Sequence, residues 1–220
     1  MTRKPYKLIS HFLPLVALLF LGACAEVDTE TESLTAEAGQ GDADAQYSSG
    51  LSYSGVLEDD KEAVKWYRKA AEQGDADAQY NLGYAHVKGY GGVQDFKEAA
   101  KWYRKAAEQG HAGAQFGLGR MYYNGYGEAQ DFKEAAKRFR KAAEQGHADA
   151  QKYLGSMYDR GRGVPKDLVT GYAWMNVANA NGAKNGSRDR DRIAKRMTPE
   201  QIAEAQKLSK VWFEKYQPKN

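Results

Sequence analysis

A short motif recurs along the 220-residue chain at an almost constant interval. Gln73–Gln79 reads QGDADAQ, and similar segments return at Gln109–Gln115 and Gln145–Gln151, each 36 residues further on. An earlier copy, Gln40–Gln46, stands 33 residues before the first of these. Periods of roughly 20–50 residues are typical of solenoids, in which a unit that cannot bury its apolar face alone buries it against the next copy. The spacing therefore predicts a stack of about four similar units.

The second half of each copy predicts an amphipathic helix. Asp95 and Glu98 form the pattern of a capping box, in which the aspartate accepts a backbone N–H and the glutamate reaches back to the N–H of the aspartate. Apolar residues then recur at helical spacing, and Gly110 ends the helix as a C-terminal cap. The equivalent box residues are Asp59 and Glu62 in copy one and Asp131 and Glu134 in copy three. The stripe of copy two is Phe96, Ala99, Ala100, Tyr103, Ala106 and Ala107.

The first half of each copy also predicts a helix. Leu82 is followed by Gly83, and the same Leu-Gly pair recurs at Leu118 and Leu154. We expect the leucine to enter the core and the glycine to let a neighbouring backbone approach closely, at some cost in helix propensity. The Gly-x-Gly turns that join the two helices lie at residues 89–91, 125–127 and 161–163.

The two ends of the array depart from the pattern, as the ends of a solenoid should. Copy one has Ser49 where the others have the core leucine, and copy four lacks the glutamate of the capping box. Thr198 then begins the sequence Thr-Pro-Glu-Gln, a capping box with proline at the first helical position. We expect a closing helix over the last repeat. Its apolar stripe is Ile202, Ala205, Ser209, Trp212, Phe213 and Tyr216.

These residues resemble the Sel-one-like repeat family, a branch of the tetratricopeptide-like superfamily. The matching pattern is A-x-A-Q-x-x-L-G-x-M-Y-x-x-G-x-G followed by D-x-x-K/E-A-x-x-W/F-x-x-K-A-A-E-Q-G, and it covers about residues 38–181. The resemblance implies an all-α fold, a right-handed α-solenoid of helix-turn-helix repeats closed by capping helices within residues 182–220. The expected repeats are 38–72, 73–108, 109–144 and 145–181. Because family members serve as adaptors, assembly factors, signalling modulators and host-interaction proteins, it also implies a non-enzymatic protein-binding scaffold.

Motifs for catalysis and metal binding are missing from the sequence. It contains no S-x-x-K, H-E-x-x-H or P-loop pattern, and Gly50–Ser54, the nearest match to a nucleophile elbow, lacks the final glycine. We expect His86 to be packed and His111 and His147 to begin helices, so neither a metal nor another cofactor is predicted. Some cysteine-rich members of the family have been called penicillin-binding or β-lactamase-like. The resemblance keeps such a hydrolase as an alternative, although this chain lacks those cysteines.

The first 23 residues have the pattern of a secretory signal, with a basic start and an apolar run over residues 8–21. Cys24 follows the sequence Leu-Gly-Ala, which resembles the lipobox of bacterial lipoproteins, so Cys24 is the expected lipidation site. Residues 24–37 predict a flexible acidic tether. We expect the chain to be exported and anchored through its lipid to the outer membrane, on the periplasmic side. The alternative is ordinary signal cleavage at this junction, which would release a soluble periplasmic protein.

Removal of the signal also removes the excess of positive charge. The formal net charge of +3 comes from three basic residues of the signal, and the rest of the chain has 29 basic and 29 acidic residues. This balance gives no indication of nucleic-acid binding. Residues 24–150 nevertheless hold 15 basic and 22 acidic side chains, whereas residues 151–220 hold 14 and 7. Solvated faces explain this difference, and a basic surface for an acidic partner or for membrane headgroups is the alternative.

Positions that vary between copies while lying on one helical face are candidates for partner binding. On the first helix of each copy they occur at offsets of three, four and three, which places them on one stripe. In tetratricopeptide-like stacks this stripe lines the concave groove, and tyrosine and arginine are typical of binding hot spots. Drift on a solvated face would give the same variation. We expect a monomer that binds an unidentified protein or peptide, either within the envelope or, as a surface or secreted factor, on a host. The candidate residues are Tyr47, Tyr80, Tyr84, Phe116, Arg120, Tyr123 and Lys152.

Overall fold

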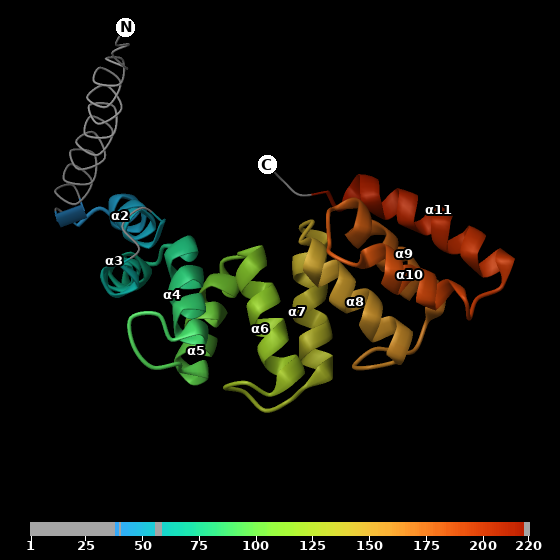
Figure 1. The fold of residues 1–220 in the computed structure, drawn as a ribbon, viewed down its shortest axis with the longest axis horizontal. Helices are drawn as coiled ribbons and strands as arrows, with labels where there is room; N and C mark the ends of the chain where they lie inside the picture. Colours follow the sequence, from blue (N-terminus) through green and yellow to red (C-terminus); the bar gives the residue numbers. More distant parts are fainter. Residues whose placement is uncertain (1–37, 40, 56–58, 218–220) are drawn as a thin grey trace, which may run out of the picture.

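Figure 1 shows a curved row of helical hairpins in the computed structural model, which describes residues 38–39, 41–55 and 59–217. Each of the eight hairpin helices has 13 residues. The described residues form helices and no strand, so the predicted all-α solenoid of four hairpins is confirmed. The hairpins are α2 (Ala43–Gly55) with α3 (Asp60–Glu72), α4 (Ala76–Lys88) with α5 (Phe96–Glu108), α6 (Ala112–Asn124) with α7 (Phe132–Glu144), and α8 (Ala148–Arg160) with α9 (Leu168–Ala180). Two helices follow, α10 (Gly186–Ala194) and α11 (Pro199–Lys215).

Each hairpin is closed by the aspartate that begins its second helix. The Asp95 carboxylate accepts a hydrogen bond from the Glu98 backbone N–H at 2.9 Å, and the Asp95 N–H donates to the His86 carbonyl at 3.0 Å. The second half of the predicted capping box is wrong, because the backbone N–H available to Glu98 is already bonded to the preceding helix. The Glu98 carboxylate instead accepts from Lys101 at 2.8 Å. Backbone N–H groups of the aspartates at positions 59, 131 and 167 close the other hairpins in the same way.

The repeated apolar residues form the core of the stack. The three leucines of the Leu-Gly pairs are fully buried, and the alanines of α3, α5 and α7 are buried as well. Gly119 lies directly against the ring of Phe139, and a Cβ there would stand 2.8 Å from ring atoms. Gly83 and Gly119 therefore make room for the aromatic residue of the following helix, whereas Gly155 lies against the Gly171 carbonyl and Met175. Trp102, which the predicted stripe omits, is also buried and packs with Tyr67 in the core of the preceding hairpin.

A chain of glutamine side chains connects successive repeats. The buried Gln79 amide donates to the Ala71 carbonyl at 3.1 Å and accepts from the Gln109 amide at 2.9 Å. The side-chain amides of Gln46, Gln115 and Gln151 donate in the same way to a backbone carbonyl eight residues earlier. In repeat four Asn181 replaces the donor glutamine. Each carbonyl that accepts from a glutamine also accepts from the backbone N–H three residues later, so the glutamine adds a second hydrogen bond at the helix end. The two glutamines of the recurring motif thus hold the repeats together.

Helices α10 and α11 cover the C-terminal end of the stack, where both contact α9. The ring centroids of Trp212 and Tyr216 lie 4.5 and 5.5 Å from that of Trp174 on α9. The capping box predicted at Thr198 is confirmed, since its N–H donates to the Gln201 side chain at 3.0 Å and its hydroxyl accepts from the Gln201 N–H at 3.3 Å. The closing helix therefore forms as expected from the sequence.

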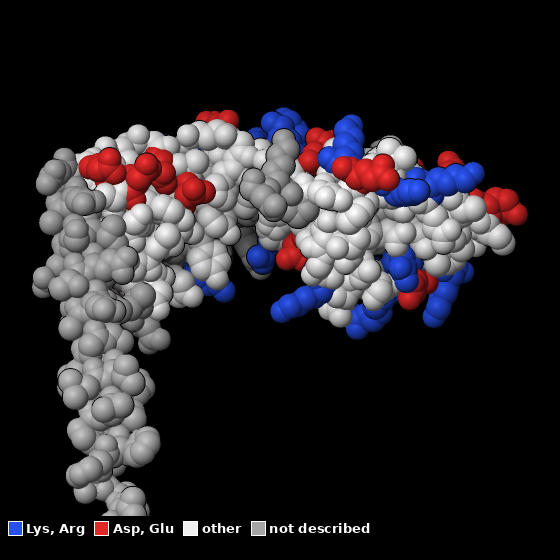
Figure 2. Space-filling view, turned by 90° about the horizontal axis from the view of Figure 1, so that it is seen from above, with Lys and Arg blue, Asp and Glu red and all other residues white. Residues whose placement is uncertain are grey.

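The row of hairpins curves with the first helices on the inner side. Helix α4 contacts α6, the first helix of the next hairpin, more extensively than any two second helices contact one another. Figure 2 shows the resulting hollow, with lysine and arginine bordering its middle and C-terminal part and a cluster of acidic side chains on the N-terminal part of the molecule. Within the described ranges no helix is both long enough and apolar enough to cross a bilayer.

Candidate binding groove

The predicted binding residues lie on four successive first helices. Tyr84 and Arg120 are exposed, and the other five are half-buried. The structure therefore brings the candidate set together along one side of the stack, with different degrees of access. The residues are Tyr47 on α2, Tyr80 and Tyr84 on α4, Phe116, Arg120 and Tyr123 on α6, and Lys152 on α8. Cys24, the predicted lipidation site, lies outside the described residues.

Two of the half-buried aromatic residues are held by histidines of the following repeat. His111 begins α6, where its Nδ1 accepts from the Ala114 N–H at 3.0 Å, and its ring stacks on Tyr80 with centroids 4.6 Å apart. His147 begins α8 and stacks on Phe116 in the same way, at 4.5 Å. The predicted capping role of both histidines is confirmed. Tyr80 and Phe116 are therefore partly committed to packing between repeats.

The capping histidines also lie close to acidic side chains. Burial lowers the pKa of His147 below its ordinary value, although the nearby Asp149 opposes this shift. A neutral ring suits the cap, because Nδ1 needs its lone pair to accept from the Ala150 N–H at 3.2 Å. His111 reaches the preceding repeat through Nε2, which lies 3.0 Å from the Asp77 carboxylate. Each histidine thus joins two neighbouring first helices.

The residues that the sequence suggests for chemistry do not form a catalytic arrangement. Ser52, in the partial elbow motif, lies within α2, and its hydroxyl donates to the Ser48 carbonyl at 3.1 Å. Ser52 is therefore an ordinary serine within a helix and does not lie at a strand-to-helix turn, where a nucleophile elbow places its serine. His86 is half-buried, and burial together with the charge of Arg68 lowers its pKa. Among the described residues, no three or more His, Cys, Asp or Glu side chains group so that they could hold a metal ion.

Two equivalent clefts open between neighbouring repeats on the groove side. The first, of about 220 Å³, lies between repeats one and two, and the second, of about 260 Å³, lies between repeats two and three. In the described part of the chain, six large hydrophobic side chains are exposed, and four of them line these clefts. They are Leu51, Tyr84 and Tyr90 in the first cleft and Tyr126 in the second. Because exposed apolar clusters mark interaction sites, the clefts indicate a binding surface.

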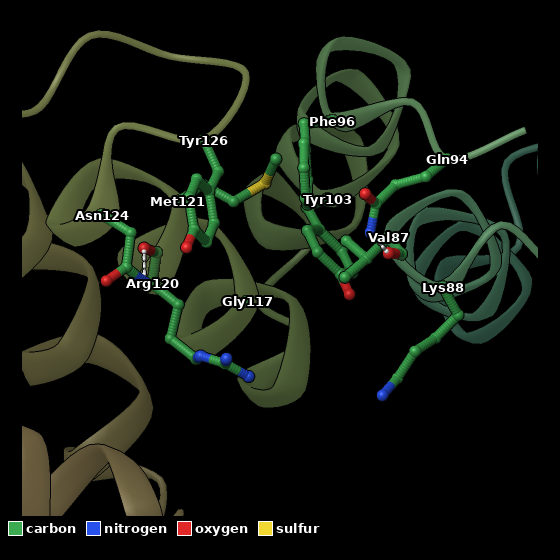
Figure 3. Close-up of a pocket in the computed structure, with 10 residues that line it drawn as sticks. All are labelled: Val87, Lys88, Gln94, Phe96, Tyr103, Gly117, Arg120, Met121, Asn124 and Tyr126. Atoms are coloured by element: carbon green, nitrogen blue, oxygen red, sulfur yellow. Dashed lines mark hydrogen bonds between the residues drawn. The ribbon is translucent and has the colours of Figure 1, made fainter.

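The second cleft has apolar walls and a basic mouth. Figure 3 shows Phe96, Tyr103 and Met121 around its interior, and the charged ends of Lys88 and Arg120 near its opening. No carboxylate lines this cleft. Neither cation forms an ion pair within the region that the structure describes. Two repeats thus contribute one unpaired cation each to the same opening.

At the next junction a tyrosine fills the corresponding space. Tyr153 on α8 stands where α6 has Gly117, and its ring centroid lies 5.0 Å from that of Phe139. A hollow of about 310 Å³ remains beside it, lined by side chains of both charges. The charged lining residues are Lys152, Arg160 and Asp189. The two junctions therefore share a framework but differ in shape and charge.

The stripe of variable first-helix positions does not include all the residues that line the second cleft. Lys88 is the last residue of α4, and Tyr126 lies in the turn after α6, so neither belongs to the compared stripe. Phe96 and Tyr103 belong to the predicted core stripe, yet they also form cleft walls. The replacement of Gly117 by tyrosine in the next copy is visible in the sequence. Only the structure, however, shows that Gly117 lines the second cleft.

Each of the segments 43–75, 76–111, 112–147 and 148–182 matches the Sel1 repeat family. One similar solved structure is that of c5321, described as a protective antigen present in uropathogenic Escherichia coli strains displaying an SLR fold. It is 39% identical with a TM-score of 0.81, over 86% of this chain and 41% of that one, so this chain spans less than half of the antigen's length. A Sel1 repeat protein from Oxalobacter formigenes is 33% identical with a TM-score of 0.70, over 81% of this chain and 75% of that one. No curated protein matches the chain.

Proposed function

Since the chain belongs to the Sel1 repeat family, we propose that it is a non-enzymatic scaffold lipoprotein of the bacterial cell envelope. It binds a protein or peptide in the groove formed by its first helices. The Sel1 repeat fold is commonly a protein-interaction scaffold, which supports the class of function. The observation that carries the proposal is the concentration of exposed aromatic side chains around the two clefts between repeats one, two and three.

The repeated and the variable residues of the first helices have different surroundings. The repeated leucine and glutamine are buried and connect neighbouring helices. In contrast, 40% of Tyr84 is exposed, and the Arg120 guanidinium lies 5.9 Å from the Phe116 ring centroid without a carboxylate partner among the described residues. Side chains that the stack does not require are free to contact a ligand. Tyrosine and arginine in such places are typical of residues that dominate binding energy.

A triple substitution tests the groove. The full chain with Tyr84→Ala, Arg120→Ala and Tyr123→Ala should lose a partner that the unchanged protein retains in affinity purification from cross-linked cells. Hot-spot truncations cost about 2 kcal/mol or more each, so recovery should fall at least about tenfold. Equal recovery of the same identified partner by both proteins would contradict the proposal.

The outer side of the stack supplies a matched control. Lys65, Lys101 and Lys137 lie on the second helices, and within the described residues each pairs only with a glutamate three residues earlier. Exposed ion pairs of this kind contribute about 0–1 kcal/mol to stability. Replacement of all three by alanine should therefore leave both the fold and the recovery of the partner unchanged.

The proposed location depends on Cys24. We expect its lipid to hold the protein at the outer membrane on the periplasmic side, because the residues before it follow the lipoprotein pattern. Cys24→Ser should move the protein from the membrane fraction to the soluble fraction and abolish metabolic labelling with an alkyne fatty acid. A labelled membrane protein in spite of this change would contradict lipidation at Cys24.

A second candidate is a surface-exposed protein that contacts a host. It is favoured by the 39% identity to c5321, which is described as a protective antigen. Digestion of intact cells with an external protease separates the two locations. Loss of the protein before any periplasmic marker would place it at the surface, whereas protection until the outer membrane is permeabilised would place it in the periplasm.

A further inference from the structure

In the described part of the chain, one tyrosine that lines the cleft between repeats two and three has a hydroxyl with no hydrogen-bond partner. Tyr103 is only 4% exposed, and its ring lies between Gly83 of its own repeat and Gly117 of the next. Among the described residues its hydroxyl has no hydrogen-bond partner, and it lines the cleft. Figure 3 shows the hydroxyl directed towards the same opening as the Arg120 and Lys88 side chains. A ligand oxygen that enters the cleft can accept a hydrogen bond from this hydroxyl.

Three donors from two repeats therefore converge at one mouth. Burial raises the pKa of Tyr103 well above its ordinary value, so the hydroxyl keeps its proton and acts as a donor. Arg120 contributes guanidinium N–H groups and Lys88 an ammonium group. Since two of these three groups are cations that only donate, and no carboxylate lines the cleft, the complementary ligand group is an anion.

The interior of the cleft fits an apolar group. Its walls are formed by Val87, Phe96, Met121 and the face of the Tyr103 ring. Its volume of about 260 Å³ is sufficient for one large side chain but not for a folded element. Gly117 contributes no side chain to this space, whereas at the next junction the equivalent Tyr153 packs against Phe139.

We propose that this cleft binds an extended segment of a partner protein in which aspartate or glutamate stands next to a large apolar residue. The carboxylate accepts hydrogen bonds from Tyr103 and Arg120 at the mouth, with Lys88 beside them. The neighbouring apolar side chain enters between Phe96 and Met121. This inference rests on the proposed scaffold function and adds the chemistry of the segment that is bound.

The first cleft provides a contrast within the same molecule. It has Ser54 and Asp60 where the second cleft has Val87 and Phe96, and no lysine or arginine lines it. The Asp60 carboxylate repels an acidic ligand instead of attracting it. Selectivity for a carboxylate is therefore specific to the second cleft and is not a general property of the repeat.

Two labelled peptides test the proposal with the purified full chain. The first is Ser-Glu-Phe-Glu-Phe-Glu-Ser, and the second has glutamine in place of each glutamate. Fluorescence anisotropy at low ionic strength should show at least about tenfold tighter binding of the glutamate peptide, because charged hydrogen bonds are about twice as strong as neutral ones. This preference should weaken as salt is added.

Two variants assign the preference to the cleft. Tyr103→Phe removes only the unpartnered hydroxyl, and it should weaken binding of the glutamate peptide about tenfold while leaving the glutamine peptide unchanged. Arg120→Gln, at an exposed position, should have a similar effect. Tyr67→Phe changes the equivalent residue of the first cleft and should not alter either affinity.

Equal affinity for the two peptides, binding of neither peptide by a protein with native circular dichroism, or unchanged binding by both Tyr103→Phe and Arg120→Gln would overturn the inference. These outcomes are distinguishable from failure of the scaffold function. If the triple alanine variant loses its partner while the two peptides bind equally, the groove binds protein without a carboxylate preference. If the triple variant keeps its partner, the groove function itself fails.

Discussion

The junction between repeats two and three and the junction between repeats three and four use the same repeated leucines, alanines and glutamines. They differ in what covers this framework. At the first, Gly117 leaves a cleft, and Arg120 has no charged partner among the described residues. At the second, Tyr153 fills the space, while Asp159, only 5% exposed, pairs with Arg196 beside α10. The difference indicates that variable residues near the C-terminal cap stabilise the end of the stack, whereas those in the middle are available to a ligand.

The largest effects should come from the shared framework. Phe139→Ala removes a fully buried ring on α7 that packs against aromatic residues of α6 and α8. The substitution should lower the free energy of unfolding by about 3–5 kcal/mol. Urea denaturation followed by circular dichroism measures this loss. Tyr84→Ala, at an exposed position, is the matched control and should change the free energy by less than about 1 kcal/mol. Equal losses for the two variants would contradict the division between framework and free surface.

A smaller effect should distinguish the two junctions through their glutamines. Gln115→Ala removes its hydrogen bonds to the Ala107 carbonyl and from the Gln145 amide and should cost about 1–3 kcal/mol. Gln151→Ala should cost more, because Gln151 also donates to the Tyr216 carbonyl in the closing segment. Urea unfolding of both variants checks this order. A smaller loss for Gln151→Ala would show that the cap does not depend on the glutamine chain.

The capping histidine at the second junction should make stability depend on pH. The folded-state pKa of His147 is lowered by burial, so the unfolded chain binds a proton more readily. The stability contributed by the neutral ring is present above the unfolded pKa of about 6.5 and is lost as the pH falls through and below that value. His147→Asn keeps a capping acceptor but does not titrate. Between pH 7 and pH 5 the unchanged protein should therefore lose more stability than the variant.

His86 does not confound this measurement. Its pKa is also lowered, but it is present in both proteins and its contribution cancels in the difference. Parallel stability curves for the two proteins would show that the His147 cap does not respond to protonation.

The smallest effect on stability should come from the mouth of the cleft. Arg120→Gln removes an exposed charge that has no ion pair among the described residues, so the free energy of unfolding should change by less than about 0.5 kcal/mol. Thermal unfolding at fixed pH is sufficient to detect a larger change. A loss above about 1 kcal/mol would mean that Arg120 supports the stack and is not reserved for a ligand.

The sequence predicts the framework well because each framework residue has one physical task that repeats. The Leu-Gly pairs, the cap at Asp95 and the closing helix after Thr198 are all found where the pattern places them. The bond from Glu98 back to Asp95 is the exception. A backbone carbonyl of the preceding helix takes that N–H, and a contact between two helices cannot be read from a pattern within one of them.

The candidate groove is predicted less completely. The stripe identifies Tyr84 and Arg120, which lie at the clefts, but it also includes Phe116, whose ring stacks on His147. It does not include Lys88, because the offset of three from Tyr84 leads to Val87, whereas Lys88 lies four residues after Tyr84. That Gly117 and Tyr103 line the same cleft depends on the packing between two repeats, which a pattern within one repeat does not contain.

Site-specific photo-cross-linking in cells tests the central claim most directly. One variant carries a photo-reactive amino acid in place of Tyr84, on the groove side, and the other carries it in place of Lys101, on the outer side. The account predicts that irradiation joins the same partner protein to position 84 and not to position 101. Adducts of equal yield at both positions, or an adduct at position 101 alone, would contradict it.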